Sequence, residues 1–152
     1  KNFDSSYLFV LVGGSNSEIK NIQKTYKEDN IKLVSHQPHD KIVYYLKSAD
    51  VLVLPNKKGD LMSEKYTSPM KLFEYMASNR PIVSADLPAI KEVLDKDTAV
   101  FFTPNNLNSL SKNIKEILDD KDKSKKISLE ASKKVLNHTW LSRAENILKF
   151  IL

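Results

Sequence analysis

A lysine and a glutamate on one face of a predicted helix are the side chains of this sequence best suited to hold a phosphate and a diol. The helix is expected over residues 70–78, with Ser68 as its N-cap and Pro69 in its first turn. Lys71 and Glu74 lie three residues apart on it. Free N–H groups and a lysine at a helix start suit a phosphate, and a carboxylate can accept hydrogen bonds from a vicinal diol. The same spacing also fits an ordinary solvent-exposed Lys–Glu pair.

Two pairs of residues after predicted strands are further candidates for ligand contacts. Gly13 and Gly14 end the first apolar run, where glycine allows either a close approach of the backbone to a ligand or a plain tight turn. His36 and Gln37 follow the second run, in a polar loop that could contact a base. The histidines of this loop have only Asp40 as a neighbouring carboxylate, so no metal site is expected.

The elements that must position these residues alternate along the chain. Short apolar runs at residues 8–12, 31–35, 51–54, 81–85 and 99–103 have the length of strands buried on both faces. Helical patterns are expected at 18–28, 41–48 (capped by Asp40), 70–78, 88–94, 107–118, 125–136 and 140–152. Such alternation predicts an α/β fold, a Rossmann-like parallel sheet with helices on both faces. The helix at 70–78 should bury Leu72, Phe73, Met76 and Ala77 and expose Lys71, Glu74, Tyr75 and Ser78.

Composition excludes several classes of protein. The 152 residues carry a net charge of +5 and no cysteine, which excludes disulfide frameworks, thiolate zinc sites and cysteine nucleophiles. The basic residues are lysines apart from Arg80 and Arg143, so nucleic-acid binding is not expected. The sequence has neither a Walker motif nor a GxGxxG or GxSxG motif, which disfavours P-loop, dinucleotide-dependent and serine-hydrolase chemistry.

Taken in order, four segments of the chain resemble a known family. VGG, KLVSHQPHDKIVYYLKSADVLVLPN, SPMKLFEYMASNRPIVSADLPAIKEVL and NHTW are similar to the C-terminal half of retaining GT-B glycosyltransferases, glycosyltransferase family 4 (glycosyl transferases group 1). The similarity runs from about Leu8 to Ile151. It implies one nucleotide-sugar-binding, Rossmann-like domain over residues 1–152, one half of a GT-B architecture.

The resemblance also implies roles for individual residues. In the family's Glu-x7-Glu motif, the second glutamate aligns with Glu74 and would hold the donor ribose. The first, which contacts the donor sugar in the family, aligns with Tyr66 and is absent, so no catalytic residue is assigned. Lys71 would face the pyrophosphate or the sugar, and the loop of His36, Gln37 and Pro38 would line the base. Thr67, Ser68 and Pro69 stand where the family often has donor-binding glycines, and Asn79 replaces a glycine at a left-handed helix cap.

The expected function is donor binding in an enzyme that moves a sugar from a nucleotide-diphosphate sugar to an acceptor hydroxyl, with retention and without metal or other cofactor. We expect the domain's first strand and an N-terminal domain for a glycan or lipid-linked acceptor to lie outside this chain, so the chain alone should be inactive. The expected location is the cytoplasm, with peripheral association of the full-length protein at the inner membrane face. Alternatives are a non-catalytic nucleotide-binding or interaction module on the same fold, or half of a sugar-nucleotide epimerase.

Overall fold

The computed structural model describes residues 2–26, 28–59, 61, 64 and 70–151. The chain divides into two compact units, Lys1–Tyr45 and Leu46–Leu152, each with a parallel sheet. The boundary falls inside helix α2 (His39–Ser48). The prediction of one domain over the whole chain therefore stays a prediction.

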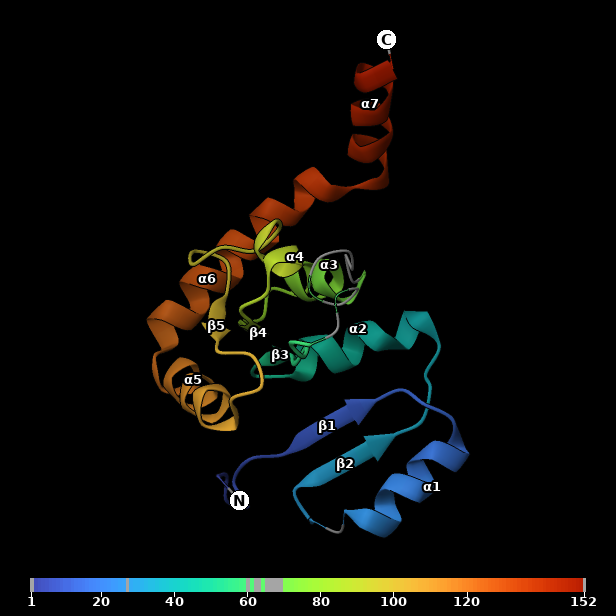
Figure 1. Cartoon of the computed structure of the whole chain (residues 1–152), viewed down its shortest axis with the longest axis vertical. Helices are drawn as coiled ribbons and strands as arrows, with labels where there is room; N and C mark the ends of the chain where they lie inside the picture. Colours follow the sequence, from blue (N-terminus) through green and yellow to red (C-terminus); the bar gives the residue numbers. More distant parts are fainter. Residues whose placement is uncertain (1, 27, 60, 62–63, 65–69, 152) are drawn as a thin grey trace. The chain divides into compact units, whose positions relative to one another are not determined.

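The first unit is a β-α-β arrangement with two parallel strands. Strand β1 (Phe9–Val12) pairs with β2 (Ile31–Val34), with Phe9 opposite Ile31 and Val12 opposite Val34. Between them runs α1 (Asn16–Thr25), which lies along the sheet (Figure 1). Ser15 caps this helix in a reciprocal capping box: its hydroxyl accepts from the Glu18 N–H, and its own N–H donates to the Glu18 carboxylate at 2.6 Å.

The second unit is a three-stranded parallel sheet in the order β3-β4-β5. The strands are β3 (Leu52–Leu54), β4 (Ile82–Ala85) and β5 (Val100–Phe102). The central strand β4 is buried at all four residues, as its continuous apolar run predicted. Its helices are α3 (Met70–Ala77), α4 (Pro88–Lys91), α5 (Leu107–Asp119), α6 (Lys121–Lys134), the 3-10 turn η2 (Val135–His138) and α7 (Trp140–Ile151).

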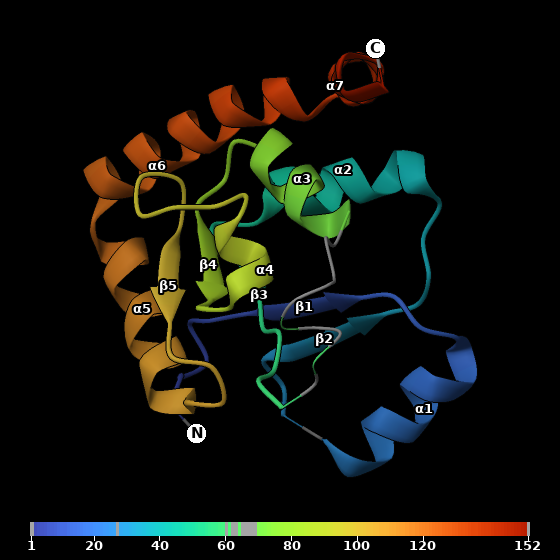
Figure 2. The same cartoon turned by 45° about the horizontal axis from the view of Figure 1, so that its top comes forward.

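The core of the second unit lies between the sheet and its helices. In Figure 2, α3 and α4 lie on one side of the strands and α5 on the other, while α6 contacts both α3 and α5. This arrangement confirms the predicted α/β fold with parallel strands flanked by helices. The side chains that are almost completely buried include Leu54, Leu72, Met76, Ile82, Leu87, Ile90, Leu94 and Ile117.

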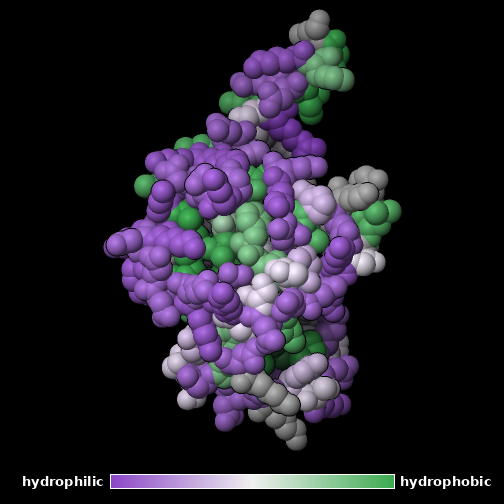
Figure 3. Space-filling view, turned by 60° about the vertical axis from the view of Figure 1, so that its left-hand side comes forward, coloured by the Kyte–Doolittle hydropathy of each residue, from purple (hydrophilic) through white to green (hydrophobic). Residues whose placement is uncertain are grey.

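The last helix, α7, contributes little to that core. It projects from the end of η2 (Figure 1), and Trp140 and Phe150 are 75% and 93% exposed. Figure 3 shows hydrophobic residues on this helix at the top of a face that is otherwise mostly hydrophilic. In the described part of the chain, no helix is both long and apolar enough to cross a membrane.

Predictions about four helices need correction at their ends. The 18–28 helix is observed as α1 over Asn16–Thr25, because Ser15 caps it and Tyr26 ends it. Asp40 is not the cap of its helix, because α2 already begins at His39 and Asp40 lies in the first turn. The 125–136 helix begins four residues earlier, at Lys121, because Asp120 ends α5 and caps α6 by accepting from the Lys123 N–H at 2.9 Å. The 88–94 helix is shorter, since α4 ends at Lys91.

The predicted faces of α3 are correct for Leu72 and Met76 and wrong at its end. Ala77 is exposed, whereas Ser78 is buried. The chain leaves the helix after Ala77, and Asn79 adopts a left-handed φ of +56°, so the helical periodicity no longer applies to Ser78. Its buried hydroxyl is satisfied by donating to the Tyr75 carbonyl at 2.7 Å. Asn79, which stands where the family usually has a glycine, thus adopts the left-handed conformation that asparagine tolerates.

Candidate functional site

In the first unit, the turn after β1 and the loop after β2 are held together by backbone hydrogen bonds. The Gly13 N–H donates to the Val34 carbonyl, and the His36 N–H donates to the Gly14 carbonyl, both at 2.9 Å. The parallel pairing of β1 and β2 thus continues past the strands. This brings together two of the predicted groups, the glycine pair and the His36 loop.

The conformation of the turn accounts for both glycines. Gly13 has a φ of +135° and Gly14 a φ of +80°, values that side chains disfavour. A Cβ on Gly13 would meet nothing within 4 Å, so the requirement is one of backbone shape rather than space. The turn leads into the capping box of α1, where hydrogen bonds from the backbone and hydroxyl of Ser15 lower the pKa of Glu18. A tight turn is therefore enough to explain why glycine stands at both positions, without a close approach of the backbone to a ligand.

The side chains of the loop after β2 differ in exposure. His36 is exposed, while Gln37 is half-buried and its amide donates to the carbonyls of Ser35 and His36, at 3.1 and 3.3 Å. This leaves the imidazole of His36 open to solvent and uses the Gln37 amide to shape the loop. The roles predicted for both residues stay predictions.

In the second unit, Lys71 and Glu74 lie on the first two turns of α3. Lys71 is exposed and Glu74 is half-buried. Tyr75, predicted to be on the polar face, is half-buried as well; burial raises the pKa of its hydroxyl, and the charge of Glu74 raises it further. Tyr66, Thr67, Ser68 and Pro69 lie outside the described residues, so the predictions made for them, the capping of α3 included, stay untested.

The carboxyl edge of the three-stranded sheet holds a group of polar residues that the sequence did not single out. The Lys58 N–H donates to the side-chain oxygen of Asn105 at 3.3 Å, and the Asn105 amide donates to the Lys58 carbonyl at 3.0 Å. Asp86, directly after β4, forms an ion pair with Lys91 at 2.9 Å. The signal for Asn105 was its place in a Pro-Asn-Asn turn directly after a strand, where asparagine tolerates a left-handed φ, here +61°.

The loop after β3 carries one more carboxylate contact. The Gly59 N–H donates to a carboxylate oxygen of Glu64 at 2.5 Å, and the φ of Gly59 is +111°. Glu64 precedes by two residues the position at which the resemblance implies a glutamate. Among the described residues, no group of three or more histidine and carboxylate side chains could hold a metal ion.

Parallel strands with polar loops at their carboxyl edges define the class of Rossmann-like α/β domains, in which ligands bind at that edge. Within this class, the chain belongs to the glycosyl transferases group 1 family, which it matches over residues 1–134. The predicted membership of the glycosyl transferases group 1 is thereby confirmed.

Among curated proteins, the chain is 32% identical over 80 residues to the amylovoran biosynthesis glycosyltransferase AmsK of Erwinia amylovora, an alignment covering 51% of this chain and 19% of that protein. Among solved structures, it is similar to sucrose-phosphate synthase of Thermosynechococcus elongatus, with a TM-score of 0.74, 20% identity and coverage of 93% of this chain and 37% of that one. It is also similar to Anabaena HepE, solved in complex with UDP-glucose, with a TM-score of 0.71, 14% identity and coverage of 97% and 43%.

These likenesses confirm the fold as one half of a GT-B architecture. The chain spans less than half the length of each of these relatives.

Proposed function

We propose that this chain is the donor-binding part of a glycosyltransferase that moves a sugar from a nucleotide-diphosphate sugar to an acceptor hydroxyl, with retention of the anomeric configuration. The observation that carries the proposal is membership of the glycosyl transferases group 1 family over residues 1–134, a range that includes α3 with Lys71 and Glu74. The AmsK relative, named for amylovoran biosynthesis, favours assembly of a polysaccharide or other glycoconjugate as the setting.

In this proposal the chain acts by positioning the donor and stabilising the leaving diphosphate. Lys71 is exposed in the first turn of α3, where a lysine gains nothing from the helix dipole and is available to a phosphate. Glu74 follows one turn later and would accept hydrogen bonds from the ribose diol. We also assign donor binding to His36, Gln37, Gly13, Gly14, Thr67 and Ser68. No metal or other cofactor enters this scheme.

The acceptor, a glycan or lipid-linked glycan, would bind to a part of the protein outside this chain. Support comes from coverage, since the chain aligns with 37% and 43% of two solved relatives. We place the reaction in the cytoplasm, with the full-length protein able to work at the inner membrane face.

The experiment that tests the proposal is calorimetric titration of the chain with UDP, GDP and ADP, and with the corresponding nucleosides. We expect one diphosphate to bind with a stoichiometry of one, and more tightly than its nucleoside. Labelled nucleotide sugars incubated with the chain alone should show no transfer. The proposal of a donor site is wrong if no nucleoside diphosphate binds, or if inorganic pyrophosphate binds as tightly as all of them.

A second candidate function is a non-catalytic nucleotide-binding module, which Tyr66 favours because it replaces the first glutamate of the family motif. The two candidates differ in turnover by the full-length protein. Steady transfer or hydrolysis of a nucleotide sugar above buffer controls supports the enzyme, and nucleotide binding without turnover supports the module.

A further inference from the structure

We propose that the second unit carries an anion-binding site for a phosphate monoester, separate from the proposed donor site. It is a hollow of about 400 Å³ between the first turns of α6, the end of α5 and the segment that leads into β4. The side chains that carry the argument are Arg80, Lys121 and Lys125, with Asp50, Asn79 and Ser124 beside them.

The hollow has a surplus of positive charge. Three cationic side chains and one carboxylate, that of Asp50, line it. In the described part of the chain, the ion pairs involve Lys91, Lys112, Lys133 and Lys134, so Arg80, Lys121 and Lys125 take part in none of these. Three cations facing one acid leave a net charge of about +2, which matches a phosphate monoester dianion at neutral pH.

The arginine is held in place without being neutralised. Its guanidinium donates to the Lys47 carbonyl at the end of α2, a neutral group. A guanidinium has five N–H donors, so this bond fixes its orientation and leaves donors for a ligand. Arg80 is also half-buried, which strengthens its interaction with an anion.

Neither lysine of the hollow forms an ion pair with another described residue. Lys121 and Lys125 are four residues apart at the start of α6, where like charges repel each other and are unfavourable to the helix dipole. Asp122, in the same turn, does not line the hollow. A bound anion would attract both lysines and the start of the helix, and would so offset both unfavourable interactions.

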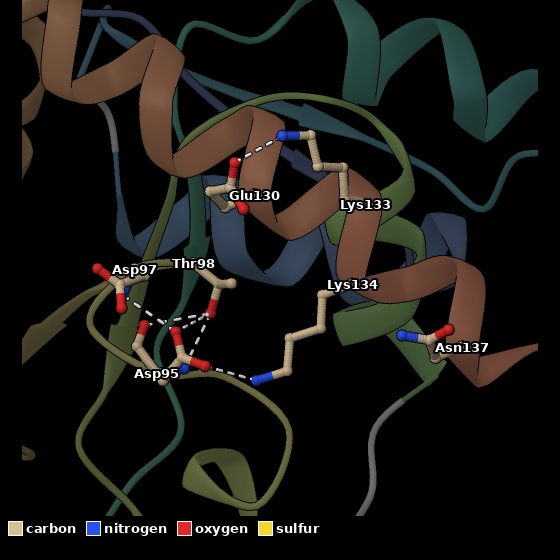
Figure 4. A pocket seen from close by; sticks show the side chains of 7 residues that line it. All are labelled: Asp95, Asp97, Thr98, Glu130, Lys133, Lys134 and Asn137. Carbon is tan, nitrogen blue, oxygen red and sulfur yellow. Dashed lines mark hydrogen bonds and ion pairs between the residues drawn. The ribbon is translucent and has the colours of Figure 1, made fainter.

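A second hollow on the same helix serves as an internal comparison. It lies at the other end of α6 and is lined by Asp95, Asp97 and Glu130 together with Lys133 and Lys134 (Figure 4). There each lysine has its own acid, with Lys134 2.6 Å from Asp95 and Lys133 2.8 Å from Glu130. Both lysines of that hollow are paired, and its three carboxylates leave a net charge of about −1, whereas the Arg80 hollow has a surplus of positive charge.

The position in the fold separates the new site from the donor site. Asp50 precedes β3 and Pro81 precedes β4, so the hollow lies at the amino edge of the parallel sheet. The donor residues are proposed for the carboxyl edge, at the opposite end of the strands. The phosphate could belong to a soluble ester or to a lipid headgroup, and the test distinguishes the two.

The test measures binding of glycerol 3-phosphate by ³¹P NMR titration, and of phosphatidylcholine vesicles with and without phosphatidic acid by co-sedimentation. The double variant Lys121→Gln/Lys125→Gln should weaken binding at least about tenfold, or about 1.4 kcal/mol. Lys133→Gln removes a paired positive charge from the other hollow of the same helix and should change binding less than about twofold. Arg80→Gln is a further variant, with circular dichroism to check its fold.

Each outcome decides the proposal. Binding of the soluble ester supports a soluble ligand, and binding of phosphatidic acid vesicles alone supports a lipid headgroup. Absence of both kinds of binding overturns the site. A loss in Lys133→Gln equal to that of the double variant also overturns it, because net charge would then explain the effect. Glu74→Gln should leave binding of the ester unchanged, which keeps this test independent of the donor site.

Discussion

Asn105 and Lys58 exchange two hydrogen bonds across the carboxyl edge of the three-stranded sheet, although they are 47 residues apart in the sequence. Lys58 follows β3 and Asn105 follows β5, so the contact bridges the end of the central strand β4. It fixes the start of the loop that precedes α3, the helix of Lys71 and Glu74. The loop geometry at this edge therefore depends on an asparagine that is distant in sequence.

Replacing Asn105 should separate the effect of its hydrogen bonds from that of its backbone. Asn105→Gly keeps the φ of +61° accessible and should lower the free energy of unfolding by about 1 kcal/mol. Asn105→Ala should lower it by about 1 kcal/mol more, because alanine is strained in the left-handed region. Urea denaturation measures both. The control is Asn79→Gly, at the other left-handed asparagine, which should be nearly neutral. Equal losses in Asn105→Gly and Asn105→Ala would contradict the assignment.

Glu74→Gln should lower the affinity for the nucleoside diphosphate by one to two orders of magnitude, about 1.4–2.8 kcal/mol. The reason is that the amide loses charge-assisted hydrogen bonds to the ribose diol. The 2′-deoxy nucleotide should bind the parent poorly and lose little further in the variant. Calorimetry measures both ligands, and Glu92→Gln, an exposed glutamate at the end of α4, is the matched control. If Glu74→Gln binds both nucleotides with unchanged affinity, Glu74 does not hold the ribose.

Lys71→Met should leave the melting temperature unchanged or raise it slightly, because Lys71 is exposed in the first turn of α3, where a positive charge opposes the helix dipole. The variant should lower the affinity for the nucleoside diphosphate more than the affinity for the uncharged nucleoside. Calorimetry with the two ligands and a thermal melt test this together, and Lys126→Met, at an exposed lysine of α6, is the control. Equal weakening of both ligands, or a clear fall in melting temperature, would show a different role.

Binding of the nucleoside diphosphate should not depend on divalent metal ions. The DxD patterns at residues 95–97 and 120–122 do not follow the carboxyl end of a strand, and the described residues include no cluster that could hold a metal. Titrations in Mg²⁺, in Mn²⁺ and in EDTA should therefore overlay. A loss of more than about tenfold in EDTA, about 1.4 kcal/mol, would require a metal in the complex.

Stability should fall in acid partly through Asp95. The hydrogen bond from Lys134, with those from Thr98 and the Asp97 N–H, holds the pKa of Asp95 below its ordinary value. A carboxyl with a lowered folded-state pKa stabilises the fold above its unfolded pKa of about 3.9 and loses this contribution as pH falls through the folded value. Asp95 and Lys134 are partly exposed, so the contribution should be less than about 1 kcal/mol.

Urea denaturation of Asp95→Asn and the parent at several pH values tests this expectation. The parent should be more stable at pH 7, and the difference should shrink below about pH 4. The exposed neighbour Asp97 is the control, since Asp97→Asn should keep the pH dependence of the parent. A stability difference between Asp95→Asn and the parent that is the same at pH 7 and at about pH 3 would show that the charge of Asp95 is not involved.

The sequence by itself was enough to place the secondary structure and the family. Each of the five described strands lies within the apolar run predicted for it, because short apolar runs rich in β-branched and aromatic residues favour strands. Burial on both faces was predicted correctly for β4, whereas no residue of β1 or β2 is buried. Asn79 stands where the resembling family usually has a glycine and tolerates a left-handed helix end, the conformation that the structure shows. Lys71 and Glu74 were predicted as donor-binding residues from helical spacing and from the resemblance. These features depend on residues close together in the chain, so local chemistry determines them.

The tertiary structure decided what depends on distant segments. The turn after Ala77 buries Ser78 because the chain there must enter β4, which helical periodicity does not describe. Asn105 meets Lys58 only because parallel pairing brings the ends of β3 and β5 to one edge. Likewise, Arg80 joins Lys121 and Lys125 around one hollow because α6 packs across the unit. Such contacts follow from how the crossovers pack, and no spacing along the sequence encodes them directly.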